Sequence, residues 1–241
     1  MEILFFISAL FSEIVGTIVG FGSSTIFLPL ALLFVDFRTA LILVALFHIF
    51  GNIGRISFFR HGLEKNVLLR FGLPSIIFTL IGALLVSFVS QSLLKAIMGV
   101  FLVFYSLLTL WKDNLQVRPT LLNAVIGGGL SGFLAGLIGT GGALRGAFLT
   151  GFGIHKEKYI ATAAAIALSV DITRIPVYFL QGFLQSKYYW YIPVLFIIAI
   201  TGSFMGKQIV NKIPQKQFKK VVLVAIFMVG LKFIYDFLLF L

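Results

Sequence analysis

The sequence predicts an all-α polytopic membrane protein made of two inverted repeats, each a broken, re-entrant helical hairpin followed by three transmembrane helices. Three observations lead to this fold class. The chain of 241 residues is 60% hydrophobic and only 11% charged, whereas soluble globular chains carry roughly 25% charged residues. Long apolar stretches recur along the whole chain, and its two halves share a pattern of glycine and polar residues. A soluble enzyme or nucleic-acid-binding domain is therefore excluded, and the net charge of +11 is assigned to membrane-flanking loops.

Eight apolar stretches are long enough to form membrane-embedded segments, since a helix needs about 20 residues to cross the hydrocarbon core. Two of them, 3–35 and 121–153, are interrupted by glycine-rich sequence at Gly20–Ser24 and Gly139–Ala143. Each of these two is predicted to be a hairpin of two helical arms around a non-helical tip. The other stretches, which are predicted to be membrane helices, are 39–59, 67–89, 93–111, 159–180, 191–205 and 218–241.

The two halves of the chain are related by a fixed offset of 119 positions, which separates Gly20 from Gly139. The same offset relates Ser12 to Ser131, Gly22 to Gly141, Ala45 to Ala164, Asn52 to Asp171, Arg55 to Arg174 and Pro74 to Pro193. A duplicated unit explains these pairs. We predict an N-terminal repeat over residues 1–113 and a C-terminal repeat over residues 119–241, within one integral membrane domain.

The basic residues test this topology, because they collect on the cytoplasmic side of a membrane protein. If all eight stretches crossed the membrane, the two sides would hold 7 and 9 basic residues. If the stretch 121–153 enters and returns on one side, the counts become 13 and 3. Re-entry of the first stretch follows from the repeat alone. Each half then has three crossings, so the second repeat is upside down relative to the first and the two tips meet near the midplane.

The two hairpin tips are the predicted binding site. Irregular backbone inside a membrane is tolerated only where it is buried in protein or lines an aqueous cavity. Exposed backbone N–H groups at glycines, and the positive N-terminal end of the helical arm that follows, favour an anion. The predicted substrate-binding residues of the tips are Gly20, Gly22, Ser23, Ser24, Gly139, Thr140, Gly141 and Gly142. The alternative interpretation is that these glycines only permit close helix packing.

Arg145 lies just after the second tip and completes the predicted substrate site. A cation near mid-membrane costs at least ~2.5 to 3.5 kcal/mol on insertion scales, so it normally has a function or a partner. We expect Arg145 to bind the anionic part of the substrate. The alternatives are an ion pair with Glu13 or Asp171, or a side chain that extends to the membrane surface.

Two pairs of polar residues are candidates for lining or gating the transport path. Asn52 and Arg55 are three residues apart, as are Asp171 and Arg174, so each pair shares one face of a helix. Opposite orientation of the repeats would place the two pairs toward opposite membrane surfaces. A neutralised structural pair is the alternative for each.

Glu13 and His48 are the other titratable residues within apolar stretches, and either is a candidate for carrying a coupling proton. For His48 the alternative is a hydrogen-bonded packing role. The sequence contains no cysteine, no phosphate-binding P-loop, no His-rich metal spacing and no serine nucleophile motif. We therefore predict that the protein is not an enzyme and uses no metal or cofactor.

The segments Gly20–Pro29 and Leu137–Gly146 resemble the paired glycine motifs of the TauE/SafE sulfite-exporter-like permeases. The layout of two four-segment halves is similar as well. The resemblance implies a multi-pass transporter of the prokaryotic inner membrane, for sulfite, organosulfonates or related small sulfur-containing anions. Its motif residues in this chain are Gly20, Gly22, Gly139, Gly141 and Gly142.

This chain departs from the family pattern at three positions. Ser24 and Ala143 stand where the family has a third motif glycine, and Phe148 stands at the position that matches Pro29. These changes leave the particular anion open.

Taken together, the residues predict a secondary transporter that moves a small anion through a midplane site in the lipid bilayer. No nucleic-acid partner is expected, and a homo-oligomer is compatible with the sequence. Two alternatives remain. A passive anion channel would show conductance far above carrier turnover. A membrane-embedded enzyme would need an acid–base pair, for which only Glu13, His48 and Asp171 are available.

Overall fold

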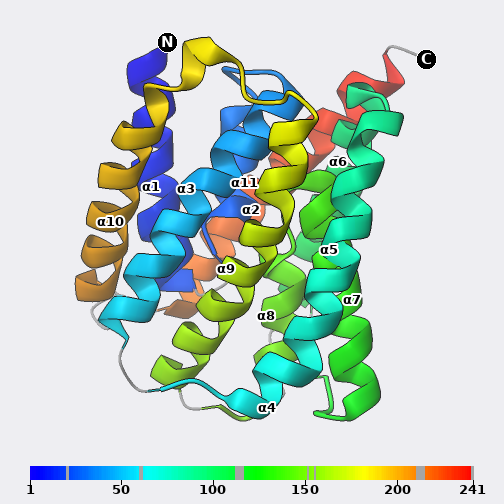
Figure 1. The fold of residues 1–241 in the computed structure, drawn as a ribbon. Helices are drawn as coiled ribbons and strands as arrows, with labels where there is room; N and C mark the ends of the chain where they lie inside the picture. The colour runs from blue at the N-terminus through cyan, green and yellow to red at the C-terminus, as the bar shows by residue number, and fades with distance from the viewer. Residues whose placement is uncertain are drawn as a thin grey trace.

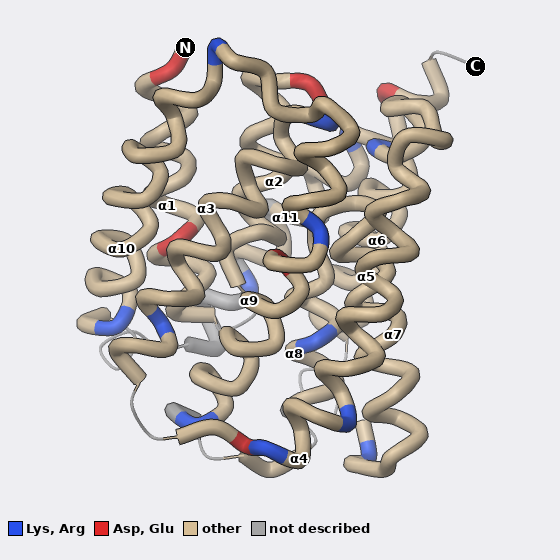
Figure 2. Tube along the Cα trace, viewed as in Figure 1, with Lys and Arg blue, Asp and Glu red and all other residues tan. Residues whose placement is uncertain are grey.

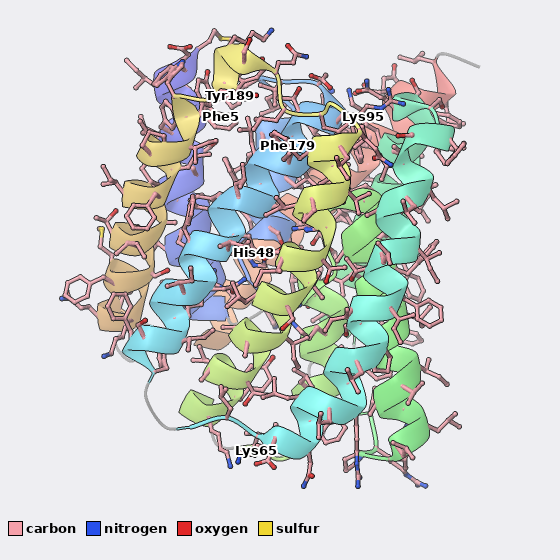
Figure 3. The ribbon with its side chains drawn as sticks, viewed as in Figure 1. Phe5, His48, Lys65, Lys95, Phe179 and Tyr189 are labelled. Carbon is pink, nitrogen blue, oxygen red and sulfur yellow. The ribbon has the colours of Figure 1, made fainter. Side chains whose placement is uncertain are left out.

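The computed structural model describes residues 1–19, 22–59, 62–111, 117–150, 152–154, 156–209 and 215–239, and within them all regular structure is helical. Within these described ranges, seven helices are long and apolar enough to cross a membrane. They lie side by side in a bundle with loops at two ends (Figure 1). Figure 3 labels Lys65 at the lower end, Lys95 and Tyr189 at the upper end, and His48 at mid-height. The prediction of an all-α protein with several membrane spans is confirmed.

The first apolar stretch forms two helices that fold back on each other. Helix α1 (Glu2–Val19) runs downward from the upper end, and the short α2 (Ser24–Ala31) returns toward it (Figure 1). Between them Gly22 has a φ of +88°, a left-handed conformation that glycine adopts without strain. Met1 and Val35 line the same surface pocket. Both ends of this hairpin therefore lie at the upper end of the bundle.

The second interrupted stretch folds in the same way from the other end. Helix α7 (Leu121–Ile138) rises from the lower end, and α8 (Gly142–Thr150) descends again (Figure 1). Gly139, with a φ of +76°, ends α7 in the left-handed conformation, which is a common way to end a helix. Pro119 and Gly153, at the two ends of this hairpin, line one pocket at the lower end.

The remaining helices connect the two ends. They are α3 (Phe37–Phe58), α4 (Lys65–Val67) continued by the π-helical turn η1 (Leu68–Gly72), α5 (Leu73–Leu85) and the 3₁₀ turn η2 (Val86–Phe88), α6 (Gln91–Trp111), α9 (Lys156–Leu180), the 3₁₀ turn η3 (Ser186–Tyr188), α10 (Tyr191–Ile209) and α11 (Gln215–Leu238). Helix α3 begins at Asp36, whose carboxylate accepts hydrogen bonds from the backbone N–H groups of Arg38 and Thr39. This is the usual N-cap arrangement.

Glycines bring several helices into backbone contact. Helix α7 packs on α5 so closely that a Cβ built at Gly132 would lie 2.1 Å from the carbonyl oxygen of Ser75. Gly128 and Gly136, one turn away on either side, approach η1 and α5 in the same way. Small residues commonly allow such close packing between membrane helices. These three glycines of α7 therefore serve helix packing. The packing alternative concerns the tip glycines, and of those Gly141 also lies against backbone, since a Cβ there would be 2.0 Å from the Ser131 carbonyl oxygen.

The outer surface of the bundle is apolar. Phe104, Leu122 and Leu180 are among many large apolar side chains that remain exposed. An exposed apolar surface of this extent marks contact with a partner or a membrane. Figure 2 shows that most charged residues lie at the two ends and only a few lie at mid-height inside the bundle. This distribution fits a protein surrounded by lipid.

Candidate functional site

The two hairpin tips meet in the middle of the bundle. The hydroxyl oxygens of Thr25, on α2, and Thr140, before α8, are 2.8 Å apart and fully buried. The two threonines are 115 positions apart in sequence. A buried hydrogen bond between hydroxyls has no water to compete with it, so it links the two tips directly.

Glu13, buried on α1, is the counter-ion of Arg55 on α3. The Arg55 Nη2 and Nε atoms lie 2.7 and 3.2 Å from Glu13 Oε1, and Ser203 Oγ donates to the same oxygen at 2.6 Å. Gly51 and Gly202 leave room for this side chain, since a Cβ at Gly51 would lie 2.5 Å from Oε1. The carboxylate is therefore held by α3 and α10 at a fixed place.

Asp171, buried on α9, accepts hydrogen bonds from three side chains. Arg174 lies on the same helix, with Nη2 and Nε 2.7 and 3.0 Å from Oδ1. On the facing helix α3, His48 Nδ1 lies 2.8 Å and Asn52 Nδ2 lies 3.2 Å from Oδ2. Because Arg55 donates to Asn52 Oδ1 at 2.7 Å, the polar contacts run without a break from Glu13 to Arg174.

The expectation that the two pairs face opposite membrane surfaces is wrong. Asn52 and Asp171 contact each other, and all four residues of the pairs are buried in one network. The physical reason is that α3 and α9 pack against each other at this point. Equivalent positions on two helices that cross in the middle of the bundle come together instead of separating.

Arg174 and Tyr178 also stabilise the break that follows α7. The last four carbonyls of a helix have no partner within it. Arg174 Nη1 donates to the Ala135 carbonyl at 2.7 Å, and the Tyr178 hydroxyl donates to the Gly136 carbonyl at 2.5 Å. A cation near a helix C-terminus is electrostatically favourable, so Arg174 serves both Asp171 and the end of α7.

Arg145, one turn into α8, is buried but is not paired in this way. Arg145 is only 5% exposed, and no carboxylate of the described residues lies within ion-pair distance of its guanidinium. The alternatives of an ion pair with Glu13 or Asp171, or of extension to the surface, are therefore not found. Glu13 balances Arg55 and Asp171 balances Arg174, so Arg145 leaves the cluster with one net positive charge.

Arg145 lines two small cavities. One is lined by Ser24, His48, Ala135, Gly139, Gly141, Gly142, Arg145, Ala167, Val170, Asp171 and Arg174, and the other by Gly16, Thr17, Gly22, Arg55, Arg145, Ile160, Ala163 and Ala164. Each offers about 10 Å³, which is room for about one water molecule. A polyatomic anion does not fit in this closed arrangement.

His48 faces this region with one ring nitrogen free. Its Nδ1 contacts Asp171, but its Nε2 is buried and has no hydrogen-bond partner among the residues that the structure describes. This atom lies next to the first tip, 3.0 Å from where a Cβ of Gly22 would stand. Figure 3 shows the His48 side chain at mid-height inside the bundle. Most buried polar atoms are paired, so this one needs an explanation.

The structure brings most of the predicted site residues together. The cavity linings include every predicted residue except Gly20, Ser23, Thr140, Glu13 and Asn52. Of these, Ser23 accepts a hydrogen bond from Arg55, Thr140 contacts Thr25, and Glu13 and Asn52 lie behind the cavities in the charged network. Gly20 lies outside the described residues.

Sequence reasoning missed Thr25, Tyr178 and Ser203. Tyr178 lies four residues after Arg174, and that spacing puts both on one helix face, so it could have been found. Nothing in the sequence around Ser203 or Thr25 indicates their distant partners. Among the described residues, no group of three His, Asp or Glu side chains is placed to hold a metal ion.

A bundle of apolar spanning helices, with broken helices and a buried charged cluster at mid-depth, defines a multi-pass membrane protein of the transporter class. Residues 4–233 match the family described as sulfite exporter TauE/SafE, and the chain belongs to this family. It is 26% identical to a probable membrane transporter protein of Methanocaldococcus jannaschii, over 86% of this chain and 85% of that protein. No solved structure matches the chain. The family is one of transporters and not of enzymes, as the sequence predicted.

Proposed function

We propose that the chain is a secondary transporter of a small anion, of the class of sulfite and organosulfonates, that binds between the two hairpin tips. The observation that carries the proposal is Arg145. It is a buried cation without a carboxylate partner among the described residues, and it contacts cavities lined by both tips. A charge in such a place has a functional role by default.

The surroundings of Arg145 favour an oxyanion. A guanidinium offers several N–H donors that match the spacing of two oxygens in a carboxylate, sulfonate or similar group. Helix α8 begins at Gly142 in the same cavity wall, and its N-terminal end adds a partial positive charge. The sulfur-containing class comes from the family name and not from this geometry.

The small volumes of the cavities support a carrier mechanism. Because each cavity has room for about one water molecule, the two tips must separate before an anion can bind. Transporters with broken helices do this by moving one part of the bundle against the other around a central site. The Thr25–Thr140 contact is then a bond of the closed state that opens on binding.

We also propose that residues 1–113 and 119–241 are inverted repeats. The bounds of α1 and α7 differ by 119 positions at both ends, and α3 and α9 start 119 positions apart. The two hairpins enter the bundle from opposite ends in Figure 1. Helix α10 packs on α1 and α3, and its equivalent α5 packs on α7 and α9. Each repeat therefore contributes one helix that packs on the other repeat. A pseudo-two-fold axis through the α3–α9 contact would produce this arrangement.

The lower end of the bundle is proposed to face the cytoplasm of a prokaryotic cell, with the bundle in the plasma membrane. Among the described basic residues near helix ends or in loops, those at that end include Lys65, Arg70, Arg118, Lys156, Lys158, Lys207 and Lys220, and those at the upper end include Arg38, Lys95 and Lys187. Basic residues concentrate on the cytoplasmic side. The larger number of basic residues at the lower end agrees with this orientation.

Thermal stabilisation of the purified protein tests the proposal. The ligands are sulfite, methanesulfonate, sulfate and acetate, with dimethyl sulfone as a neutral analogue. A ligand at 100 times its Kd adds about 2.7 kcal/mol to the free energy of unfolding. We expect stabilisation by sulfite or methanesulfonate and none by the sulfone. The Arg145→Gln variant should lose this stabilisation, whereas Arg70→Gln, an exposed arginine at the lower end, should keep it.

Two results would overturn the proposal. One is stabilisation of the wild type by none of these anions at concentrations well above millimolar. The other is an unchanged anion response in Arg145→Gln, which would remove Arg145 from the site. If the wild type responds as expected, counterflow of labelled sulfite in proteoliposomes distinguishes a carrier from a passive channel.

A further inference from the structure

We infer that each anion is carried together with one proton, and that His48 Nε2 holds this proton in the bound state. The inference rests on the proposed function, because it concerns the same central site. It starts from two geometric observations, which are the hydrogen bond of one imidazole nitrogen to a carboxylate and the unpartnered second nitrogen beside the anion cavity.

The contact with Asp171 fixes the role of Nδ1. An ionised carboxylate only accepts hydrogen bonds. Asp171 is flanked by Arg174 and contacted by the Asn52 amide, which favours its ionised form. The Nδ1 atom, 2.8 Å from Asp171 Oδ2, is therefore the donor and carries a hydrogen. When the imidazole is neutral, its Nε2 then presents a lone pair.

That lone pair points at the place where the anion is proposed to bind. His48 lines the same cavity as Arg145, Gly141 and Gly142, and its Nε2 adjoins Gly22 of the first tip. A lone pair and an anion repel each other, whereas an Nε2–H would donate a hydrogen bond to the anion. Binding is therefore strongest when Nε2 carries a proton, which makes anion affinity depend on proton binding.

The charges around His48 explain why the proton would arrive with the anion. Asp171 and Arg174 on α9, Arg145 on α8 and Arg55 on α3 surround the ring, and Glu13 of α1 lies behind Arg55. Tyr159 is a further titratable side chain near Arg145. Without an anion, an imidazolium would add a second unbalanced cation beside Arg145. A bound anion offsets this charge, so each ligand increases the affinity for the other.

Glu13, the other candidate for a coupling proton, also has a buried atom without a hydrogen-bond partner among the described residues, Oε2, but it differs from His48 in its place relative to the cavities. Its Oε1 accepts hydrogen bonds from Arg55 and Ser203, and a Cβ built at Gly51 would lie 2.6 Å from its Oε2. It lines neither of the cavities beside Arg145. Glu13 is thus a fixed counter-ion. The step at His48 is balanced, since a proton from water binds the Nε2 lone pair, the Nδ1–H bond stays intact and no other bond changes.

Calorimetry on the whole purified protein tests the inference. Binding of methanesulfonate, which remains ionised throughout, is measured near pH 8 in buffers of different ionisation enthalpy. Sulfite is measured in parallel, with its own titration subtracted. We expect uptake of about one proton per bound anion and an apparent Kd that rises up to about tenfold per pH unit above the imidazole titration.

A variant locates the proton. His48→Asn keeps an amide donor that can reach Asp171 and removes the ring atom that faces the cavity. We expect weaker anion binding with no net proton uptake. Glu64→Gln, a titratable residue of the lower end that pairs with Lys158, should retain uptake of one proton. Melting of each variant without ligand shows whether it is folded. The wild-type proton count stands as a test even if His48→Asn does not fold.

The outcomes separate this inference from the proposed function. Anion binding by the wild type without proton uptake would overturn the inference and leave the proposed function in place. Proton uptake that persists in folded His48→Asn would overturn the assignment to this residue. Binding of neither anion would overturn both. In proteoliposomes, acidification of the lumen driven by an inward methanesulfonate gradient, lost in His48→Asn, is the expected transport result.

Discussion

Buried charge in this protein is organised as a chain of alternating partners. Glu13, Arg55, Asn52, Asp171 and Arg174 contact one another in that order across α1, α3 and α9. Moving an ion out of water costs several kcal/mol even after relaxation, so every member depends on its neighbours. Arg145 is the exception, and this contrast is the reason for assigning binding to Arg145 and structural roles to the others.

Removing one partner of the Glu13–Arg55 pair should destabilise the protein strongly. In Glu13→Gln the Arg55 charge stays buried without a counter-ion, and breaking a buried pair typically costs about 3–5 kcal/mol. The matched control is Lys232→Gln, which breaks an exposed pair with Asp236 and should have little effect. Thermal unfolding in detergent compares the two. Equal losses would contradict a structural role for Glu13.

Helix packing depends on glycine at defined positions and not on glycine content in general. On α7, Gly128, Gly132 and Gly136 face backbone carbonyls of the η1–α5 segment, whereas Gly129 faces the side chain of Phe78. Backbone cannot move aside without shifting the helix, but a half-exposed aromatic ring can turn. The two kinds of glycine on one helix therefore should respond differently to the same substitution.

We predict that Gly132→Ala lowers stability far more than Gly129→Ala. The new Cβ in Gly132→Ala would lie 2.1 Å from the Ser75 carbonyl oxygen, whereas in Gly129→Ala it would lie 3.3 Å from the Phe78 ring. Overpacking of this kind costs about 1–3 kcal/mol. The measurement is the thermal midpoint of each variant in the same detergent. A similar loss in both would mean that α5 and α7 are not in backbone contact there.

The whole molecule is arranged around two hairpins. The first begins and ends at the upper end of the bundle, and the second begins and ends at the lower end. The ends of the first hairpin meet in the pocket lined by Met1 and Val35, and the ends of the second meet in the pocket lined by Pro119 and Gly153. Each hairpin would therefore enter the membrane and return on the same side. Their tips meet at Thr25 and Thr140, so the proposed site lies inside the bundle, between its two ends.

Single-cysteine labelling in cells tests this topology, because the natural sequence contains no cysteine. We expect Arg118→Cys and Ile154→Cys, at the ends of the second hairpin, to react with a membrane-impermeant reagent from one side only. Glu2→Cys and Leu33→Cys, at the ends of the first, should react from the opposite side. Labelling of positions 118 and 154 from different sides would show that the second stretch crosses the membrane.

Much of this molecule could be predicted because the signals are local. The apolar stretches predict the spanning helices, since a helix in lipid satisfies its backbone hydrogen bonds within one segment. The glycines at both tips predict the breaks, and Gly22 and Gly139 do adopt a positive φ that disfavours other residues. Arg145 and His48 could be singled out because polar side chains are rare in apolar stretches.

The sequence by itself therefore determined the membrane class, the helices, the two interruptions and the candidate polar residues. Only the tertiary structure decided which of these residues contact one another. Arg55 lies 42 positions from Glu13, and His48 lies 123 positions from Asp171. Such pairings depend on how helices cross, and no local pattern encodes a crossing. For that reason the sequence predicts that the Asn52–Arg55 and Asp171–Arg174 pairs lie apart, whereas the structure brings them together. The free nitrogen of His48 is likewise visible only in the packed bundle.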